Sequence, residues 1–300
     1  MKKIAVFTDC DLDGLSTFQV FRWYTKHENI YHEICSQSNF RKTFQRWAKR
    51  NRPSDFDKIY IFDLDVSQNN IDLVDYKNFV IIDHHDSHVR NKDKYKYAKT
   101  ALKEYTSCCK LLYSMFKHKY KDVKLTIPQK LLVLLTDDYD SYELKMKDSY
   151  NLNVVVWNYA GDRAGQFLRD FGDGFKGFSD EHHNMIHFNN KRVARILREL
   201  QVFSGVIPIA GKDYHVCATM ADKCLNEVAH HVIDKHGCDI CLVVNMRTRR
   251  VSFRKNKEQA FEVDLGKLAA NLADGGGHIH SAGGSLTDRV MTLTKILKPV

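Results

Sequence analysis

The sequence has few prolines and cysteines and no long apolar run. Its 300 residues include 4 Pro, 15 Gly and 8 Cys. So little proline and glycine excludes a collagen-like chain or a Pro/Gly-rich disordered one, and so few cysteines exclude a disulfide-built scaffold. No apolar run approaches the ~20 residues that a membrane helix needs. These absences favour a globular protein.

The N-terminus also lacks the pattern of a secretion signal. Residues 1–3 include two lysines, but the apolar stretch Ile4–Phe7 soon ends at Asp9. That stretch is too short for the apolar region of a signal peptide. We therefore expect a soluble, cytoplasmic protein with no membrane partner.

Positive charge is in excess. The chain has 46 Lys+Arg against 37 Asp+Glu, a formal net charge of +9. A basic balance suits a polyanionic partner such as nucleic acid or a nucleotide, although a need for solubility alone would also produce it. A length of 300 residues predicts two domains.

In the first half of the chain, apolar runs alternate with amphipathic segments. Runs at Lys3–Thr8, Lys58–Phe62 and Phe79–Ile82 are typical of buried strands. Helices are expected at Leu15–Thr25, Thr106–Lys117 and Pro128–Leu135. This order predicts βαβ units and a parallel sheet. The Gly- and Asp-rich segment Gly161–Asp180 is expected to be a loop.

The pattern restarts in the second half. A helix is expected over Glu181–Phe203, and it has a basic face formed by Lys191, Arg192, Arg195 and Arg198. Strand candidates follow at Val206–Ile209, Val216–Ala218, Ile240–Asn245 and Val251–Phe253. Asp264 can cap a helix from Leu265 to Leu272. The predicted division is residues 1–180, a linking helix over 181–205, and residues 206–300.

Three carboxylates at alternate positions follow the first apolar run. They are Asp9, Asp11 and Asp13, and Gly14 comes next. Buried carboxylates without a partner repel one another, and no Lys or Arg lies within the motif. Hard cations such as Mg²⁺ or Mn²⁺ remove that repulsion. A calcium-binding EF-hand loop is excluded, because its twelfth position would be Val20 instead of Glu.

Acids and histidines also follow the other two strands. Asp63 follows the second, and Asp83-His84-His85-Asp86 follows the third. The carboxyl ends of parallel strands meet at one edge of a sheet, so these groups should converge there. A further acid from Asp137, Asp138 or Asp140 would complete a mixed Asp/His set for two metals, which is a common arrangement for phosphoryl hydrolysis.

These residues resemble, in order and spacing, the four motifs of the DHH phosphoesterase superfamily. The motifs are Asp9-Cys10-Asp11-Leu12-Asp13-Gly14, Asp63, Asp83-His84-His85 and Asp138. The distal segment from Gly275 to Gly284 resembles the GGGH motif of the DHH-associated second domain, and Val251–Arg254 is similar to the strand before it. The likeness spans nearly the whole chain.

The resemblance implies an α/β fold. Residues 1–180 would form a catalytic, metal-binding domain with a parallel sheet. Residues 206–300 would form a smaller, mixed α/β, substrate-binding domain, with the active-site cleft between the two. The resemblance also implies two bound divalent cations, with Mn²⁺ preferred over Mg²⁺ because imidazole is a ligand. It implies that a metal-bridged hydroxide is the nucleophile.

Residue roles also follow from the resemblance. The metal ligands would be Asp9, Asp11, Asp13, Asp63, His84 and Asp138, with Asp63 bridging. Asp83 would orient the histidines and His85 would face the substrate phosphate. Gly276, Gly277 and His278 would cradle a phosphate, and Arg254 would clamp another.

The sequence departs from the family pattern in two places. Many members have a histidine where Phe7 stands, and the form found here is closer to RecJ-type exonucleases. In the fourth motif Asp137, Asp138 and Asp140 could each reach a metal. The spacing from Asp138 to Tyr142 resembles one family variant and favours Asp138.

The substrate class stays open between three functions. The two-domain size suits hydrolysis of short oligonucleotides or small nucleotides. A RecJ-like 5′→3′ exonuclease on single-stranded nucleic acid is the first alternative, although no residues remain for an added OB-type domain. A non-catalytic scaffold is the second, and the full set of acids argues against it. An inorganic pyrophosphatase fits less well, because the distal motif is GGGH.

A second basic cluster lies near the distal motif. It consists of Arg247, Arg249, Arg250, Lys255 and Lys257. These residues could follow a phosphate backbone, or they could form a solvated strand edge that blocks aggregation.

Overall fold

The computed structural model describes residues 3–26, 30–104, 106–256 and 262–300. The chain divides into two units, Met1–Ile186 and His187–Val300, and the cut falls inside one helix. Among the described residues no helix is long and apolar enough to cross a membrane. Lys257 lies outside the described residues.

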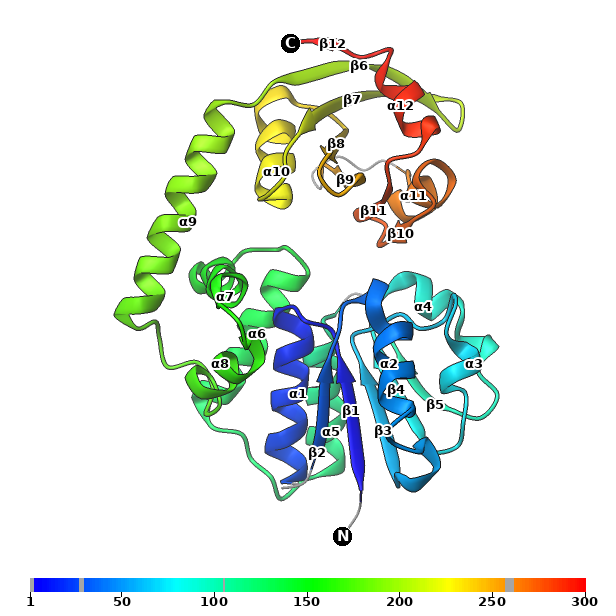
Figure 1. The fold of residues 1–300 in the computed structure, drawn as a ribbon. Helices are drawn as coiled ribbons and strands as arrows, with labels where there is room; N and C mark the ends of the chain where they lie inside the picture. The colour runs from blue at the N-terminus through cyan, green and yellow to red at the C-terminus, as the bar shows by residue number, and fades with distance from the viewer. Residues whose placement is uncertain (1–2, 27–29, 105, 257–261) are drawn as a thin grey trace. The chain divides into compact units, whose positions relative to one another are not determined.

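The first unit is built on a parallel sheet of five strands (Figure 1). The strands are β1 (Ile4–Thr8), β2 (Ile30–Ile34), β3 (Lys58–Phe62), β4 (Phe79–Asp83) and β5 (Lys99–Leu102). Their order across the sheet is β2-β1-β3-β4-β5, so β1, β3 and β4 are neighbours. The apolar character of these three central strands follows from their position, because both faces of a parallel sheet are covered.

Helices cover both faces of this sheet. They are α1 (Leu12–Thr25), α2 (Phe40–Ala48), α3 (Ile71–Val74), α4 (Asp86–Arg90), α5 (Cys108–Lys119), α6 (Ile127–Asp140), α7 (Lys147–Asn158) and α8 (Arg163–Asp170). Ile4 and Val6 of β1 belong to one core with residues of α1 and α5. Ala5 and Phe7 belong to another core with residues of α2. Alternate side chains of one strand therefore build two separate layers of core.

The central strands were predicted correctly from the sequence, whereas one edge strand and one helix were not. The predicted strand over 58–62 is the observed β3, and the first and third runs correspond to β1 and β4. The edge strand β2 was missed, because His32 and Glu33 interrupt its apolar pattern. The loop expected at Gly161–Asp180 is wrong in part, because α8 forms there with Phe167 fully buried.

The second unit contains a mixed sheet of seven strands in the order β10-β11-β9-β8-β7-β6-β12. The strands are β6 (Val202–Ile209), β7 (Lys212–Met220), β8 (Ile240–Asn245), β9 (Arg250–Lys255), β10 (Gly276–Gly277), β11 (Ser281–Ser285) and β12 (Lys298–Pro299). Its helices are α10 (Leu225–His236), α11 (Leu265–Ala273) and α12 (Asp288–Thr294). Helix α9 (Asp180–Arg198) contains the boundary between the units.

In the second unit one local prediction is confirmed and two are corrected. Asp264 caps α11 as predicted, since its side chain accepts a hydrogen bond from Lys267 N at 3.1 Å. The helix expected over Glu181–Phe203 ends earlier, at Arg198, because β6 begins at Val202. Lys255 is buried and its Nζ donates to Val263 O at 3.0 Å, so this residue is not part of an exposed basic cluster.

Phe7 provides a test of the first unit's core. Its ring is fully buried and lies against Phe44 and Trp47, with ring centroids 5.3 and 5.1 Å away. We expect Phe7→Ala to lower the free energy of unfolding by about 3–5 kcal/mol, because it leaves a large cavity. Urea unfolding measures this loss. Tyr97→Ala, at an exposed ring, is the control and should change stability little.

Candidate metal centre

The acids and histidines that follow β1, β3 and β4 converge at one edge of the sheet. β1 pairs with β3 in parallel register, and β3 pairs with β4 in the same way. Their carboxyl ends therefore lie side by side (Figure 1). Asp9 follows β1, Asp63 follows β3, and His84 follows β4. The predicted convergence is confirmed.

His84 lies close to three of the acids. Its Nε2 atom lies 3.1 Å from Asp63 Oδ1 and 3.6 Å from Asp13 Oδ2. On the other side of the ring, Nδ1 lies 3.6 Å from Asp140 Oδ2. Asp13, His84 and Asp140 each offer an atom to one group within 4.8 Å, and Asp63 joins His84 in a second group. Oxygen and imidazole donors this close together suit a transition-metal or Mg²⁺ ion.

Asp13 is held in place by the first turn of α5. Cys108 N–H donates to its Oδ2 at 2.7 Å, and Cys109 N–H donates to its Oδ1 at 2.8 Å. The N-terminal amides of a helix favour such a carboxylate. Nevertheless burial, followed by the charge of Asp140, raises the pKa of Asp13 well above its usual range. The amides of α5 therefore position the Asp13 carboxylate, but they do not outweigh the effect of burial and of the Asp140 charge on its pKa.

Asp63 adopts an unusual backbone conformation. Its φ angle is +57°, in the left-handed region, where a residue with a side chain is rarely found. Its N–H donates to Ile82 O at 3.1 Å, which ties it to the end of β4. Burial, and then the charges of Asp13 and Asp11, raise its pKa well above the usual range. Strain of this kind clusters at functional sites.

Asp9 and Asp11 lie in the short segment between β1 and α1. The Asp11 side chain caps the helix, accepting from Gly14 N at 3.0 Å. Burial and the neighbouring Asp11 raise the pKa of Asp9 to about 7. Gly14 is required sterically, because a Cβ atom there would meet the Asp9 backbone. The glycine thus allows the helix to begin directly against the acidic loop.

Asp83 connects two histidines behind the cluster. Its Oδ1 lies 2.8 Å from His85 Nδ1, and its Oδ2 lies 2.6 Å from His88 Nδ1. His88 Nε2 in turn lies 2.7 Å from Tyr95 Oη. Although burial opposes it, the imidazoles of His85 and His88 lower the pKa of Asp83 well below its usual range.

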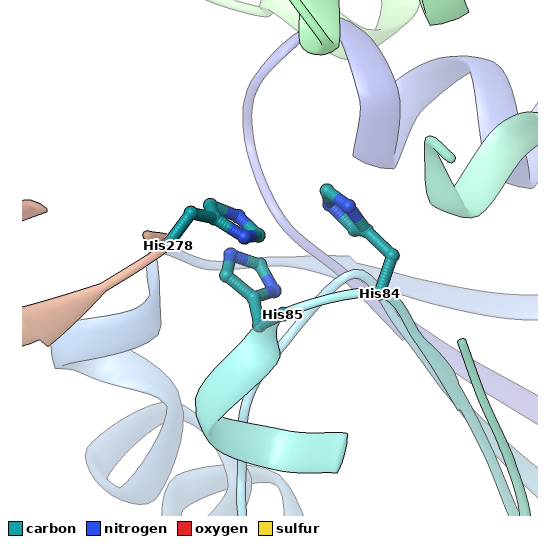
Figure 2. A group of neighbouring side chains, drawn as sticks. All are labelled: His84, His85 and His278. Atoms are coloured by element: carbon teal, nitrogen blue, oxygen red, sulfur yellow. The ribbon is translucent and has the colours of Figure 1, made fainter. Parts of the chain in front are cut away.

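His88 was not among the residues predicted from the sequence. Its signal was its position, three residues after His85 and thus one helical turn along α4. Although burial opposes it, the Asp83 carboxylate raises the pKa of His85 to about 10. Figure 2 shows His85 at the start of α4, and its ring centroid lies 4.8 Å from that of His84.

The three acids at the end of α6 point to three different partners. Asp137 pairs with Lys110 Nζ at 2.6 Å. The Asp138 carboxylate accepts from Lys145 N at 3.0 Å, Met146 N at 3.0 Å and Ser149 Oγ at 2.6 Å. Only Asp140 has an oxygen in the groups of ligand atoms found among the described residues. The structure therefore brings Asp140 to His84, whereas the spacing in the sequence favoured Asp138.

An arginine outside the four motifs supports the acidic loop. Arg163 Nη1 donates to Cys10 O at 3.2 Å, and the guanidinium lies 4.3 Å from the centroid of the Trp157 ring. A cation over an indole face is attracted by the ring. Arg163 thus ties the start of α8 to the loop that carries Asp9 and Asp11. The segment had been expected to be a loop, so this residue was missed.

The distal motif of the second unit is explained in part by chain packing. Gly277 has a φ angle of +143°, and a Cβ atom there would meet Ser281 O. His278 N–H donates to Ser281 O at 2.8 Å, which closes the turn between β10 and β11. Arg254, the expected phosphate clamp, donates from Nε to Asn226 Oδ1 at 3.0 Å. Gly276 lies within β10.

The donor set of the first unit fits divalent cations. Among the described residues no lysine or arginine pairs with Asp13 or Asp63, although both carboxylates are buried. Burying such charges together is costly unless a cation compensates them. An imidazole and carboxylate oxygens are the ligands that Mn²⁺ and Mg²⁺ sites use.

Comparisons with known proteins match the first part of the chain to one family. Residues 3–136 match the model of the DHH family, N-terminal domain. No curated protein matches the chain in sequence.

Several solved structures have the same fold. RecJ in complex with Mn²⁺ from Thermus thermophilus is 13% identical with a TM-score of 0.64, covering 98% of this chain and 51% of that one. The pGpG-specific phosphodiesterase PggH from Vibrio cholerae is 11% identical with a TM-score of 0.57, covering 98% and 99%. An exopolyphosphatase-related protein from Bacteroides fragilis is 12% identical with a TM-score of 0.52, covering 98% and 91%.

Substitution can distinguish the role of Asp140 from that of Asp138. We expect Asp140→Asn to weaken Mn²⁺ binding by about tenfold or more, because it removes a charged oxygen next to His84. We expect Asp138→Asn to lower the free energy of unfolding by about 1–3 kcal/mol instead, because three donors lose a charged acceptor.

Isothermal titration with Mn²⁺ and urea unfolding of both variants measure these effects. Each variant is the control for the other, since both remove one negative charge from the same helix end. Loss of Mn²⁺ binding in Asp138→Asn with normal binding in Asp140→Asn would restore Asp138 as the ligand.

Proposed function

We propose that the chain is a DHH phosphoesterase, a two-metal phosphodiesterase that acts on short oligonucleotides or small nucleotides. The match of residues 3–136 to the DHH family, N-terminal domain, supports this proposal. The observation that carries the proposal is the set of buried carboxylates around His84, with Asp63 Oδ1 at 3.1 Å. A purely structural cluster would be expected to pair these acids with lysine or arginine. A site for cations explains why they are kept together.

The proposed ligands come from four segments of the first unit. They are Asp9, Asp11, Asp13, Asp63, His84 and Asp140, the last in place of Asp138. Asp63 lies closest to His84 of the three acids measured from that ring, which supports its assignment as the bridging ligand. The imidazole donor favours Mn²⁺ over Mg²⁺. Two cations bound here would supply Lewis acidity and activate water for attack on a phosphoester.

The neighbouring residues would bind and orient the substrate. Asp83 holds the Nδ1 edge of His85 at 2.8 Å and fixes the ring. An imidazolium held by a buried carboxylate is suited to bind a phosphate oxygen by a charge-assisted hydrogen bond. His278 is proposed to contact the terminal phosphate of the substrate. Gly276 and Gly277 are proposed to bring backbone N–H groups close to it.

His84 tests the catalytic proposal. We expect His84→Ala to lower Mn²⁺-dependent hydrolysis by about 10²-fold or more, because loss of a ligand costs more than loss of a residue that only orients one. Chelation with EDTA should abolish the parent activity, and added Mn²⁺ should restore it. The exposed His118→Ala in α5 is the matched control. Normal turnover by a folded His84→Ala variant would refute the assignment.

His278 tests the role of the second unit. We expect His278→Ala to raise KM by about tenfold, with a smaller change in kcat, because a hydrogen bond to a charged group contributes roughly 1.5–3 kcal/mol. Steady-state kinetics on a dinucleotide separate the two constants. An unchanged KM would remove this residue from the substrate site.

A length series of labelled single strands separates the candidate substrates. Mn²⁺-loaded protein is incubated with RNA and DNA strands from the dinucleotide to about thirty nucleotides. Preference for the shortest strands would support the proposed function. Steady degradation of long strands from the 5′ end would favour the RecJ-like alternative, and no hydrolysis of any substrate would favour a scaffold.

A further inference from the structure

The second unit carries a basic helix face that the proposed chemistry does not use. It consists of Lys191, Arg192, Arg195 and Arg198 on α9, with Phe188 beside them, and we call it the α9 face. Residues 188, 191, 195 and 198 are spaced by three or four, so they lie on one side of the helix. No acidic residue occurs between His187 and Arg198.

The opposite side of the same helix is fixed to the core. Ile196 and Leu197 are partly buried and pack against the cluster that contains Val228 and Val232 of α10. The helix is therefore amphipathic, with Lys191, Arg195 and Arg198 exposed to solvent. A helix held in this way presents the charged side chains on a rigid backbone, which lowers the entropic cost of binding a ligand.

The cations of the α9 face are not used for internal ion pairs. In the part of the chain that the structure describes, Lys191, Arg195 and Arg198 have no carboxylate within ion-pair distance. Arg192 Nη2 donates to Asn189 Oδ1, whereas its buried Nε has no hydrogen-bond partner among the described residues. Together with Phe188, these four side chains line a hollow on the surface. Unpaired cations around a hollow are suited to an anionic ligand.

We propose that the α9 face binds the phosphate backbone of single-stranded nucleic acid, and this rests on the proposed function above. The helix rises about 10 Å from Lys191 to Arg198, so its cations lie along a line that successive phosphates of one strand can follow. Phe188 is 67% exposed and offers a ring on which an unpaired base can stack. A duplex would have no free base for that ring, so a single strand is the occupant that fits.

The binding test uses the full chain without metal. Fluorescence anisotropy follows a labelled single strand of about 12 nucleotides in EDTA, so that hydrolysis does not enter the measurement. We expect the triple variant Lys191→Gln, Arg195→Gln and Arg198→Gln to bind about tenfold or more weakly. The dependence of log K on log salt should become less steep by about 2, because three phosphate contacts are lost at roughly 0.7 each.

Phe188→Ala isolates the stacking contact. It should weaken binding of the single strand by about fivefold or more and leave the salt slope unchanged, because it removes no charge. The matched control neutralises three exposed cations of the first unit, Lys42, Lys49 and Arg50, with the same change in net charge. That variant should bind nearly as the parent does.

Two outcomes would overturn the proposal. One is equal binding by the α9 variant and the control variant. The other is an equal loss of affinity for polyglutamate, which would indicate a surface for acidic proteins. The two hypotheses fail in different experiments. Normal hydrolysis by His84→Ala would refute the proposed function, whereas strand binding in EDTA tests the α9 face independently of hydrolysis.

Discussion

The structure of the first unit depends on one interaction, the repulsion between buried carboxylates that lie close together at the carboxyl edge of its sheet. Asp13 and Asp63 lie 3.6 and 3.1 Å from the same nitrogen of His84. Folding must hold these charges together although their repulsion and burial favour separation. The parallel register of β1, β3 and β4 makes this possible, because the strongly apolar strands fix the ends from which the acids extend.

A second layer of contacts positions that cluster. The first turn of α5 fixes Asp13 by two backbone amides, and Asp83 is fixed between two imidazoles. Arg163 supports the loop after β1 from a helix that is far away in sequence. Each of these contacts connects a segment that carries a site residue to a different element. The geometry of the centre therefore depends on the packing of the whole unit.

The sequence predicts the strands that carry the acids, since apolar runs that end in Asp or His are visible without a structure. It also predicts that Asp63 and His84 meet, because parallel strands share an edge. It does not separate Asp138 from Asp140, because both end the same helix and only its rotation decides which one faces His84. Nor does it show that Lys255 is buried, since the segment around it resembles an exposed basic strand.

Gly14 has a consequence for anyone who would transplant this centre into another protein. The carboxylates of the first motif supply the oxygen atoms, and the glycine supplies the space, because its missing Cβ leaves room for the backbone of Asp9. A strand–helix junction that received the acids alone would be forced open by any side chain at this point. Searches and grafts should therefore treat the glycine as part of the ligand geometry.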